Sequence, residues 1–229
     1  MRSTSADSPV PDRDLTNRAR IRDAAVAVFG ERGFSTGVRA VAAAAGVSPG
    51  LVNHHFGSKE GLRAECDAHV LEVFRIVKTE SLTRPSAAGL LHQLAEVEEY
   101  APLLAYLIRS WQAGGPLAHS MFEHLVANTE RYLADGVAAG TLRPSRDPAA
   151  RARYLSMQNL GGTLLFLQMR CTDDGPVDWP GALRELTDEI MFPALELFTE
   201  GLFLDRTYLE TVLEQREQST DSETSSKTA

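Results

Sequence analysis

The strongest constraint on the fold comes from helix stop and start signals that crowd into residues 46–58. Gly46 can adopt the left-handed backbone conformation that ends a helix. Ser48 is a natural N-cap, and Pro49 suits the first helical position because an N–H there would have no intrahelical partner. Gly57 ends the new helix after a short run. The spacing therefore predicts a very short helix between two others.

Two helices are predicted before this short one. The first begins near Leu15 or Thr16 and stops at Gly33, and its single apolar stripe consists of Ile21, Ala24, Ala25, Val28 and Phe29. The second carries on one face Val38, Val41, Ala42 and Ala45. Two short helices joined by a tight turn and braced by a longer amphipathic helix are typical of a helix-turn-helix, whose second short helix enters the DNA major groove.

The rest of the chain also predicts helices, because no stretch alternates apolar and polar residues as a strand would. A helix at 58–81 is followed by apolar-periodic segments at 86–112, 117–139, 148–171, 180–201 and 206–216. The polar stretches 1–14 and 217–229 are predicted to be disordered tails. We therefore expect an all-α fold between two tails.

Charge is distributed unevenly along the chain. Residues 1–63 carry nine Lys or Arg and six Asp or Glu, whereas the remainder carries 14 Lys or Arg and 25 Asp or Glu. The net charge of the whole chain is -8. Such asymmetry favours a polyanion-binding N-terminal end on an acidic body. Ordinary scatter of surface charge explains the counts about as well, so charge alone does not decide between the two.

Several classes of protein are disfavoured. No apolar run is long enough for a membrane span or a signal peptide, so we expect a cytoplasmic protein. Cys66 and Cys171 are far apart in sequence and form no CxxC pair, so both are expected to be reduced thiols. The adjacent histidines His54 and His55 lack further ligands at metal-binding spacing, and no nucleophile or acid accompanies them. We expect no metal, no cofactor and no catalytic site.

The stretch "AVFGERGFSTGVRAVAAAAGVSPGLVNHHFGSKEGL" resembles the N-terminal DNA-binding domain of the tetracycline-repressor (TetR/AcrR-like) family of bacterial transcriptional regulators. Weaker similarity continues in "GTLRPSRDPAARA" and "FPALELFTEGL". The resemblance implies a helix-turn-helix domain at residues 15–63 and a C-terminal ligand-binding and dimerisation domain at 64–216.

The chain departs from the family pattern at two places. The family commonly caps the second helix with a Thr/Ser pair, whereas Gly37 stands there in this chain, so Thr36 is the expected cap. Asn53 replaces a DNA-contacting Tyr, and His54 occupies the more variable aromatic position that follows it. His55 matches a position whose ring packs into the helix junction, so we expect the two histidines to have different roles.

The resemblance and the helix geometry together predict the DNA contacts. Asn53 can bond bidentately to adenine, and Arg39 and Lys59 suit phosphate contacts. The alternative for Asn53 is a solvated polar residue without a role. The residues expected to contact DNA are Arg39, Ser48, Pro49, Gly50, Asn53, His54 and Lys59.

The C-terminal part is rich in aromatic residues and methionines, which are more often plain core than pocket. The family resemblance shifts this balance toward a cavity among the middle helices. The residues expected to line it are Leu104, Ile108, Trp111, Phe122, Leu125 and Met157. Gly161 and Gly162 disfavour a helix, and close approach of another helix, as at a dimer seam, would explain them.

These features predict a homodimeric repressor that binds a palindromic operator in double-stranded DNA. A small hydrophobic or amphipathic effector is expected to release it by acting through the helix at 58–81. The alternatives are an activator or a ligand-independent regulator of the same fold. A helical ligand-binding protein or enzyme with a coincidental helix-turn-helix is disfavoured by the extent of the motif.

Overall fold

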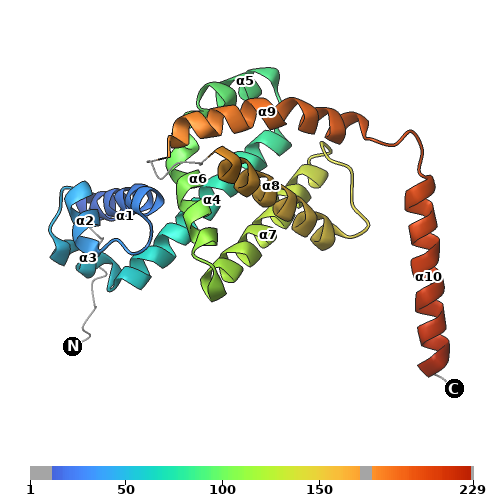
Figure 1. Ribbon diagram of the computed structural model, residues 1–229, viewed down its shortest axis with the longest axis horizontal. Coiled ribbons are helices and arrows are strands. Elements are labelled where there is room, and N and C mark those ends of the chain that lie inside the picture. The colour runs from blue at the N-terminus through green and yellow to red at the C-terminus, as the bar shows by residue number, and fades with distance from the viewer. Residues whose placement is uncertain (1–11, 171–176, 228–229) are drawn as a thin grey trace, which may run out of the picture. The chain divides into compact units, whose positions relative to one another are not determined.

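The structure is a computed structural model that describes residues 12–170 and 177–227. All regular structure in these two ranges is helical, which confirms the predicted all-α fold (Figure 1). The helices are α1 (Asp12–Arg32), α2 (Val38–Ala44), α3 (Pro49–Phe56), α4 (Lys59–Thr83), α5 (Ala87–Ala95), the 3-10 helix η1 (Val97–Tyr100), α6 (Ala101–Gln112), α7 (Gly115–Ala138), α8 (Pro148–Arg170), α9 (Trp179–Glu200) and α10 (Thr207–Lys227).

The chain divides into two compact units, Met1–Leu186 and Thr187–Ala229, so the division falls inside α9. In the first unit, α1, α2 and α3 form a head, and α4 leads from it into a body made of the following helices (Figure 1). α1 packs against α6, α4 against α7, and α7 against α8. The predicted domain boundary at residue 63 lies within α4 and does not separate two compact units.

One apolar core runs from the head into the body. It contains, among others, Phe29 of α1, Val41 of α2, Val52 of α3, Leu62 of α4 and Tyr106 of α6. All five side chains are buried. Burial of an apolar side chain of this size stabilises a fold by about 1.5–3 kcal/mol. The shared core explains why the head and the body form one unit.

The head lies very close to the body at Gly30. A Cβ atom built there would stand 3.0 Å from Ala105 Cβ and 3.0 Å from the Tyr106 backbone nitrogen. Real side chains rarely tolerate such contacts, so glycine permits α1 to lie directly on α6. A second core cluster in the same unit joins α6, α8 and the start of α9 through Ile108, Phe166, Trp179 and Leu186.

The helix predicted at 86–112 is in fact three segments, α5, η1 and α6. Pro102, which falls inside the predicted segment, lies in the first turn of α6. Proline removes a backbone donor and its ring clashes with the carbonyl four residues earlier, so a helix start accommodates it better than a helix interior.

Helices extend into both stretches that were predicted to be tails. α1 begins at Asp12, inside the stretch 1–14 that we expected to be disordered, and residues 1–11 lie outside the described part of the chain. α10 continues through Lys227 and takes in most of the predicted tail 217–229. The preceding residues are rich in Glu, Gln and Arg, which favour a helix without needing an apolar stripe.

The second unit consists of the end of α9 and of α10, with Gly201 at φ +81° between them. Its large apolar side chains are mostly exposed, among them Phe192 and Phe198 of α9. Near the start of α10, the rings of Phe203 and Tyr208 lie 5.2 Å apart. None of the described helices is both long enough and apolar enough to cross a membrane.

Candidate nucleic-acid interface

The capping signals position α3 as predicted. The Ser48 side chain accepts a hydrogen bond from the Leu51 N–H at 3.2 Å, and Pro49 occupies the first turn. Gly57 ends the helix at φ +71°, and its N–H donates to the Asn53 carbonyl at 2.8 Å. A side-chain N-cap stabilises a helix by about 1 kcal/mol, which matters most for a helix this short.

One face of α3 is fixed in the core. Val52 and Phe56 are buried, and Leu51 packs partly buried against the same cluster. Val41 of α2 and Ile21 of α1 belong to this cluster too. The helix therefore cannot rotate about its axis without exposing apolar surface, and its outer face has a fixed direction.

The outer face of α3 carries the residues predicted to contact DNA. All five on or next to the helix are exposed: Ser48, Pro49, Gly50, Asn53 and His54. The Asn53 amide forms no hydrogen bond with any described residue, so its donors and acceptor are available to a base. His54 is exposed and His55 half-buried, which agrees with the different roles expected of the two histidines.

The two basic residues predicted to bind phosphate have different surroundings. Arg39 projects from α2 and is exposed. Lys59 is partly buried, and its Nζ donates to the Phe34 carbonyl at 2.5 Å. This bond ties the start of α4 to the loop that precedes α2 and occupies one of the three ammonium protons. The phosphate contact of Lys59 stays a prediction.

Arg18 has a structural role that the sequence did not reveal. Its guanidinium donates to the His55 carbonyl at 2.7 Å and to Glu65 at 2.6 Å, and it lies over the Phe56 ring at 4.7 Å from the ring centroid. Arg18 thus holds the end of α3 against α1 and α4. The partners lie far along the chain, so no local pattern in the sequence predicts them.

The start of α2 differs from the prediction. Thr36 does not cap the helix, because its hydroxyl lies 3.4 Å from the Arg32 carbonyl and donates to it. Gly37 is the N-cap residue, and no side chain caps the helix. Val41 and Ala42 are buried, so packing rather than capping holds α2 in place.

A polar link joins α4 and α6 just behind the head. The Tyr106 hydroxyl donates to Asp67 Oδ1 at 2.6 Å, and the Tyr106 ring is fully buried. Burial raises the pKa of Asp67, and the bond from Tyr106 opposes that rise. Phe34 contacts the Tyr106 ring edge to face, with centroids 5.4 Å apart, and the Arg63 guanidinium lies 3.7 Å from the Phe34 ring centroid. This link connects the body helix α6 to the loop that leads into α2.

The six residues predicted to line a ligand cavity have mixed environments. Ile108 is fully buried in the second core cluster, Phe122 lies under the Arg153 guanidinium, and Met157 is exposed. The other three are partly buried against the cores: Leu104, Trp111 and Leu125. The indole nitrogen of Trp111 is buried and has no acceptor among the described residues. The role of these six residues as a ligand site stays a prediction.

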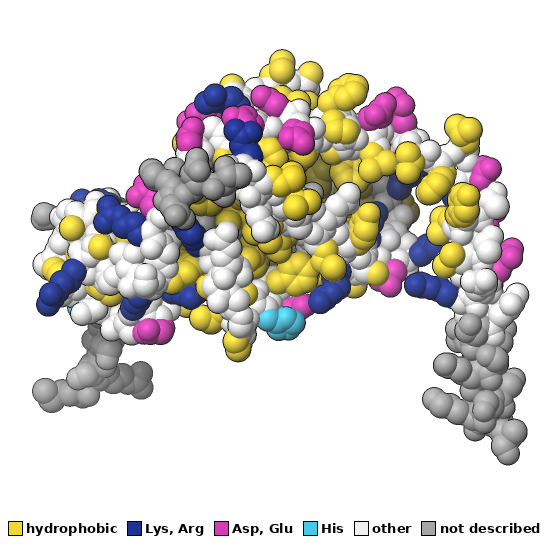
Figure 2. Space-filling model, in the orientation of Figure 1, with side chains coloured by type: hydrophobic (Ala, Val, Ile, Leu, Met, Phe, Trp, Pro, Cys, Tyr) yellow, Lys and Arg dark blue, Asp and Glu magenta, His cyan; other side chains and the backbone are white. Residues whose placement is uncertain are grey.

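α8 carries an exposed apolar stripe at helical spacing. Tyr154, Met157, Leu165 and Met169 are all more than half exposed. Hydrophobic side chains gather on the middle of the face shown in Figure 2, where Figure 1 places α8. Cβ atoms built at Gly161, which lies on this stripe, and at the adjacent Gly162 would meet nothing within 4 Å. Packing inside the described chain therefore does not explain these glycines.

Comparison with known proteins agrees with this architecture. Residues 21–66 match a family described as bacterial regulatory proteins, tetR family, and residues 98–204 match the tetracyclin repressor-like C-terminal domain. The chain is 50% identical over 205 residues to the HTH-type transcriptional regulatory protein RaaS of Mycobacterium tuberculosis, and the match covers 90% of this chain and 95% of RaaS.

Solved structures share the fold at low sequence identity. A TetR transcriptional regulator from Chloroflexus aurantiacus has a TM-score of 0.52 and 19% identity, over 82% of this chain and 96% of that one. FadR from Bacillus subtilis, solved in complex with stearoyl-CoA, has a TM-score of 0.51 and 21% identity, over 81% of this chain and 99% of that one.

The first family match falls on the head, and the second covers most of the body and continues into the second unit. The identity to a regulator extends over nearly the whole chain. The first match contains α2 and α3, the two short helices of the head. The chain belongs to the tetR family of bacterial transcriptional regulators and is not an enzyme.

Proposed function

We propose that the chain is a homodimeric repressor that acts in the bacterial cytoplasm and is released from a palindromic operator by a small hydrophobic or amphipathic molecule. The observation that carries the DNA-binding role is the outer face of α3. Its polar residues are exposed, while caps and core packing fix the direction in which they point.

Within this proposal the outer-face residues divide into two roles. Asn53 reads a base edge in the major groove, because its amide can bond bidentately to adenine. Arg39, Lys59 and the N-terminal end of α3 at Ser48 contact phosphates, which position the helix without reading sequence. No arginine stands on α3 to bind guanine bidentately, so part of the specificity comes from DNA shape.

Dimerisation follows from the geometry of DNA. Two recognition helices reach successive major grooves only when a two-fold partner places them about 34–36 Å apart. The apolar stripe on α8, with Gly161 open to solvent, supports α8 as one part of the interface. The exposed apolar side chains of α9, such as Phe192 and Phe198, support α9 as the other part.

Release by an effector requires a path from the body to the head. α4 is continuous from the head into the body, so a molecule bound among the middle helices can act by tilting it. FadR of Bacillus subtilis, a protein of similar fold, has been solved with stearoyl-CoA bound. A ligand shifts such an equilibrium only by its different affinity for the two arrangements.

The proposal is tested by recovering the binding site from the host genome with the purified full chain and sequencing the bound DNA. We expect a palindromic site and an affinity that falls steeply with salt, because phosphate contacts release counterions. Transcription from the recovered promoter should fall when the protein is added. Recovery of random genomic fragments, or a rise in transcription, would contradict the proposal.

Release by an effector has a separate test. Leu104→Trp and Leu125→Trp are expected to fill the cavity predicted among the middle helices and so to weaken the response to an effector. Their affinity for DNA without effector should stay near that of the parent chain. Calorimetry with a recovered effector measures the change directly. Unchanged effector binding in both variants would place the ligand elsewhere.

A further inference from the structure

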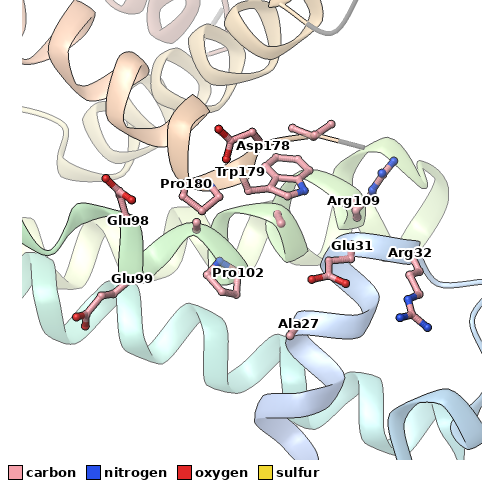
Figure 3. Close-up of a pocket in the computed structure, with 13 residues that line it drawn as sticks. Ala27, Glu31, Arg32, Glu98, Glu99, Pro102, Arg109, Asp178, Trp179 and Pro180 are labelled. Carbon is pink, nitrogen blue, oxygen red and sulfur yellow. The ribbon is translucent and has the colours of Figure 1, made fainter. Parts of the chain in front are cut away.

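A cavity of about 600 Å³ lies within the first compact unit, apart from the six residues predicted to bind a ligand. Three segments far apart in the sequence surround it: the end of α1, the start of α6 with η1, and residues 177–180 at the start of α9 (Figure 3). It therefore lies against both the DNA-binding head and the body.

One wall of the cavity is apolar. Trp179 lines it with a side chain that is only 9% exposed and belongs to the second core cluster. Pro102 and Pro180 extend this wall. Figure 3 shows the indole nitrogen on the side of the ring that faces Glu31, and no described residue accepts a hydrogen bond from it. The wall thus offers a flat aromatic surface with an indole N–H on its Glu31 side.

The charged lining is mostly acidic, with the carboxylates of Glu31, Glu98, Glu99 and Asp178. Glu98 pairs with Arg184 at 2.5 Å, and Asp178 accepts the Gly181 N–H at 3.2 Å. Glu31 and Glu99 form no ion pair with any described residue. Two carboxylates at the rim of the aromatic wall therefore lack an ion-pair partner among the described residues.

The lining holds two cations, Arg32 and Arg109, against four carboxylates. The Arg109 Nε donates to the Gly30 carbonyl at 3.3 Å. Arg32 extends away from Trp179 in Figure 3, whereas the Glu31 carboxylate extends toward the space between Trp179 and Pro102. The field inside the cavity therefore favours a positive charge.

We propose that this cavity binds an organic cation with a flat apolar body and an oxygen acceptor. The body stacks on the Trp179 ring, where a cation is attracted by the ring face, and the acceptor receives the indole N–H. Glu31 and Glu99 balance the charge. Because the cation contacts α1 and α6 together, it stabilises their packing. The effect of the cation on DNA binding rests on the proposed function, whereas binding of the cation to the cavity does not.

The test uses two dyes of one scaffold, tetramethylrhodamine methyl ester, a monocation, and fluorescein methyl ester, a monoanion. Fluorescence anisotropy of each dye is measured against the full chain without DNA. We expect saturable binding of the cation at one site per chain and affinity for the anion at least about tenfold lower. Equal binding of both dyes, or no saturable binding of the cation, would overturn the proposal.

Variants locate the site. Glu31→Gln is expected to weaken binding of the cationic dye about fivefold, the size expected for one partly exposed charge. Glu196→Gln makes the same charge change on an exposed part of α9 outside the cavity and should leave the affinity unchanged. In a Trp111→Phe background, Trp179 is the only tryptophan, and its emission should change as the dye binds.

An unchanged affinity in Glu31→Gln together with unchanged Trp179 emission would place the dye elsewhere and refute the site. Glu99→Gln provides a second charge variant, and circular dichroism checks that each variant is folded. A chain that binds its operator but not the cation refutes this inference alone. A chain that binds the cation but no specific DNA refutes the proposed function alone.

Discussion

The hydrogen bond from Tyr106 to Asp67 is the contact between α4 and α6 whose removal has the clearest expected effect. Tyr106→Phe deletes the hydroxyl and keeps the ring, so the packing against Phe34 remains and no cavity of side-chain size forms. Hydrogen bonds to charged groups contribute about 1.5–3 kcal/mol to stability. We expect the free energy of unfolding to fall by about that amount, which corresponds to a melting temperature about 3–12 °C lower in a unit of this size.

The loss of unfolding free energy in Tyr106→Phe should depend on pH, because its size depends on whether Asp67 is ionised. Burial raises the pKa of Asp67 in the folded chain, so its contribution to stability is present at low pH and is lost as the pH rises through the folded pKa. The Tyr106 hydroxyl favours the ionised carboxylate and limits this loss. Removing it should therefore cost most where Asp67 is fully ionised, and progressively less as the pH falls through the folded pKa.

Urea unfolding followed by circular dichroism at fixed protein concentration measures both effects, because concentration alters the apparent stability of a dimer. Tyr208→Phe is the matched control, since Tyr208 is 71% exposed and should tolerate the change within about 0.5 kcal/mol. A loss in Tyr106→Phe below about 0.5 kcal/mol, or one that does not shrink as Asp67 becomes protonated at low pH, would refute this account of the link.

Three further predictions concern other contacts. Burial raises the pKa of Cys66 to about 12, so in a Cys171→Ser variant the folded chain should not react with a thiol reagent at pH 8 and should react on unfolding. Gly30→Ala should lower the free energy of unfolding by about 1–3 kcal/mol, because its Cβ meets α6 at 3.0 Å; a neutral result in urea unfolding would contradict the close approach. Gly161→Trp, where a Cβ meets nothing in the chain, should leave the fold intact and split the dimer in sedimentation; an intact dimer would exclude this seam.

The parts of the fold that depend on local chemistry could be predicted from the sequence. Gly46 and Gly57 have positive φ, as their places at helix ends require, and the Ser48 side chain caps α3. These signals act within a few residues, so the sequence displays them directly. The exposed face of α3 follows from the same signals together with helical periodicity.

Contacts between distant segments could not be predicted in this way. Arg18 and Tyr106 look like ordinary surface and core residues in the sequence, yet each joins helices that are far apart along the chain. The cavity next to Trp179 is assembled from three such segments. Its acidic residues are scattered along the sequence, and no spacing pattern marks them.

Competition between local preferences explains the remaining differences. The apolar pattern around Pro102 favours one continuous helix, but the proline ring favours a new start, and the structure has α6 begin there. In the C-terminal stretch, the absence of an apolar stripe suggested disorder, whereas the structure continues α10 through Lys227.

The central claim is that the outer face of α3 reads DNA sequence, and the affinity of Asn53→Ala for operator and for random DNA tests it most directly. We expect this variant to lose about 1–3 kcal/mol at the operator and almost nothing on random DNA. Arg39→Ala is the comparison, because a phosphate contact should weaken binding to both DNAs alike and reduce the salt slope by about one unit. An equal loss on operator and random DNA in Asn53→Ala would contradict the assignment of Asn53 and of this face to sequence recognition.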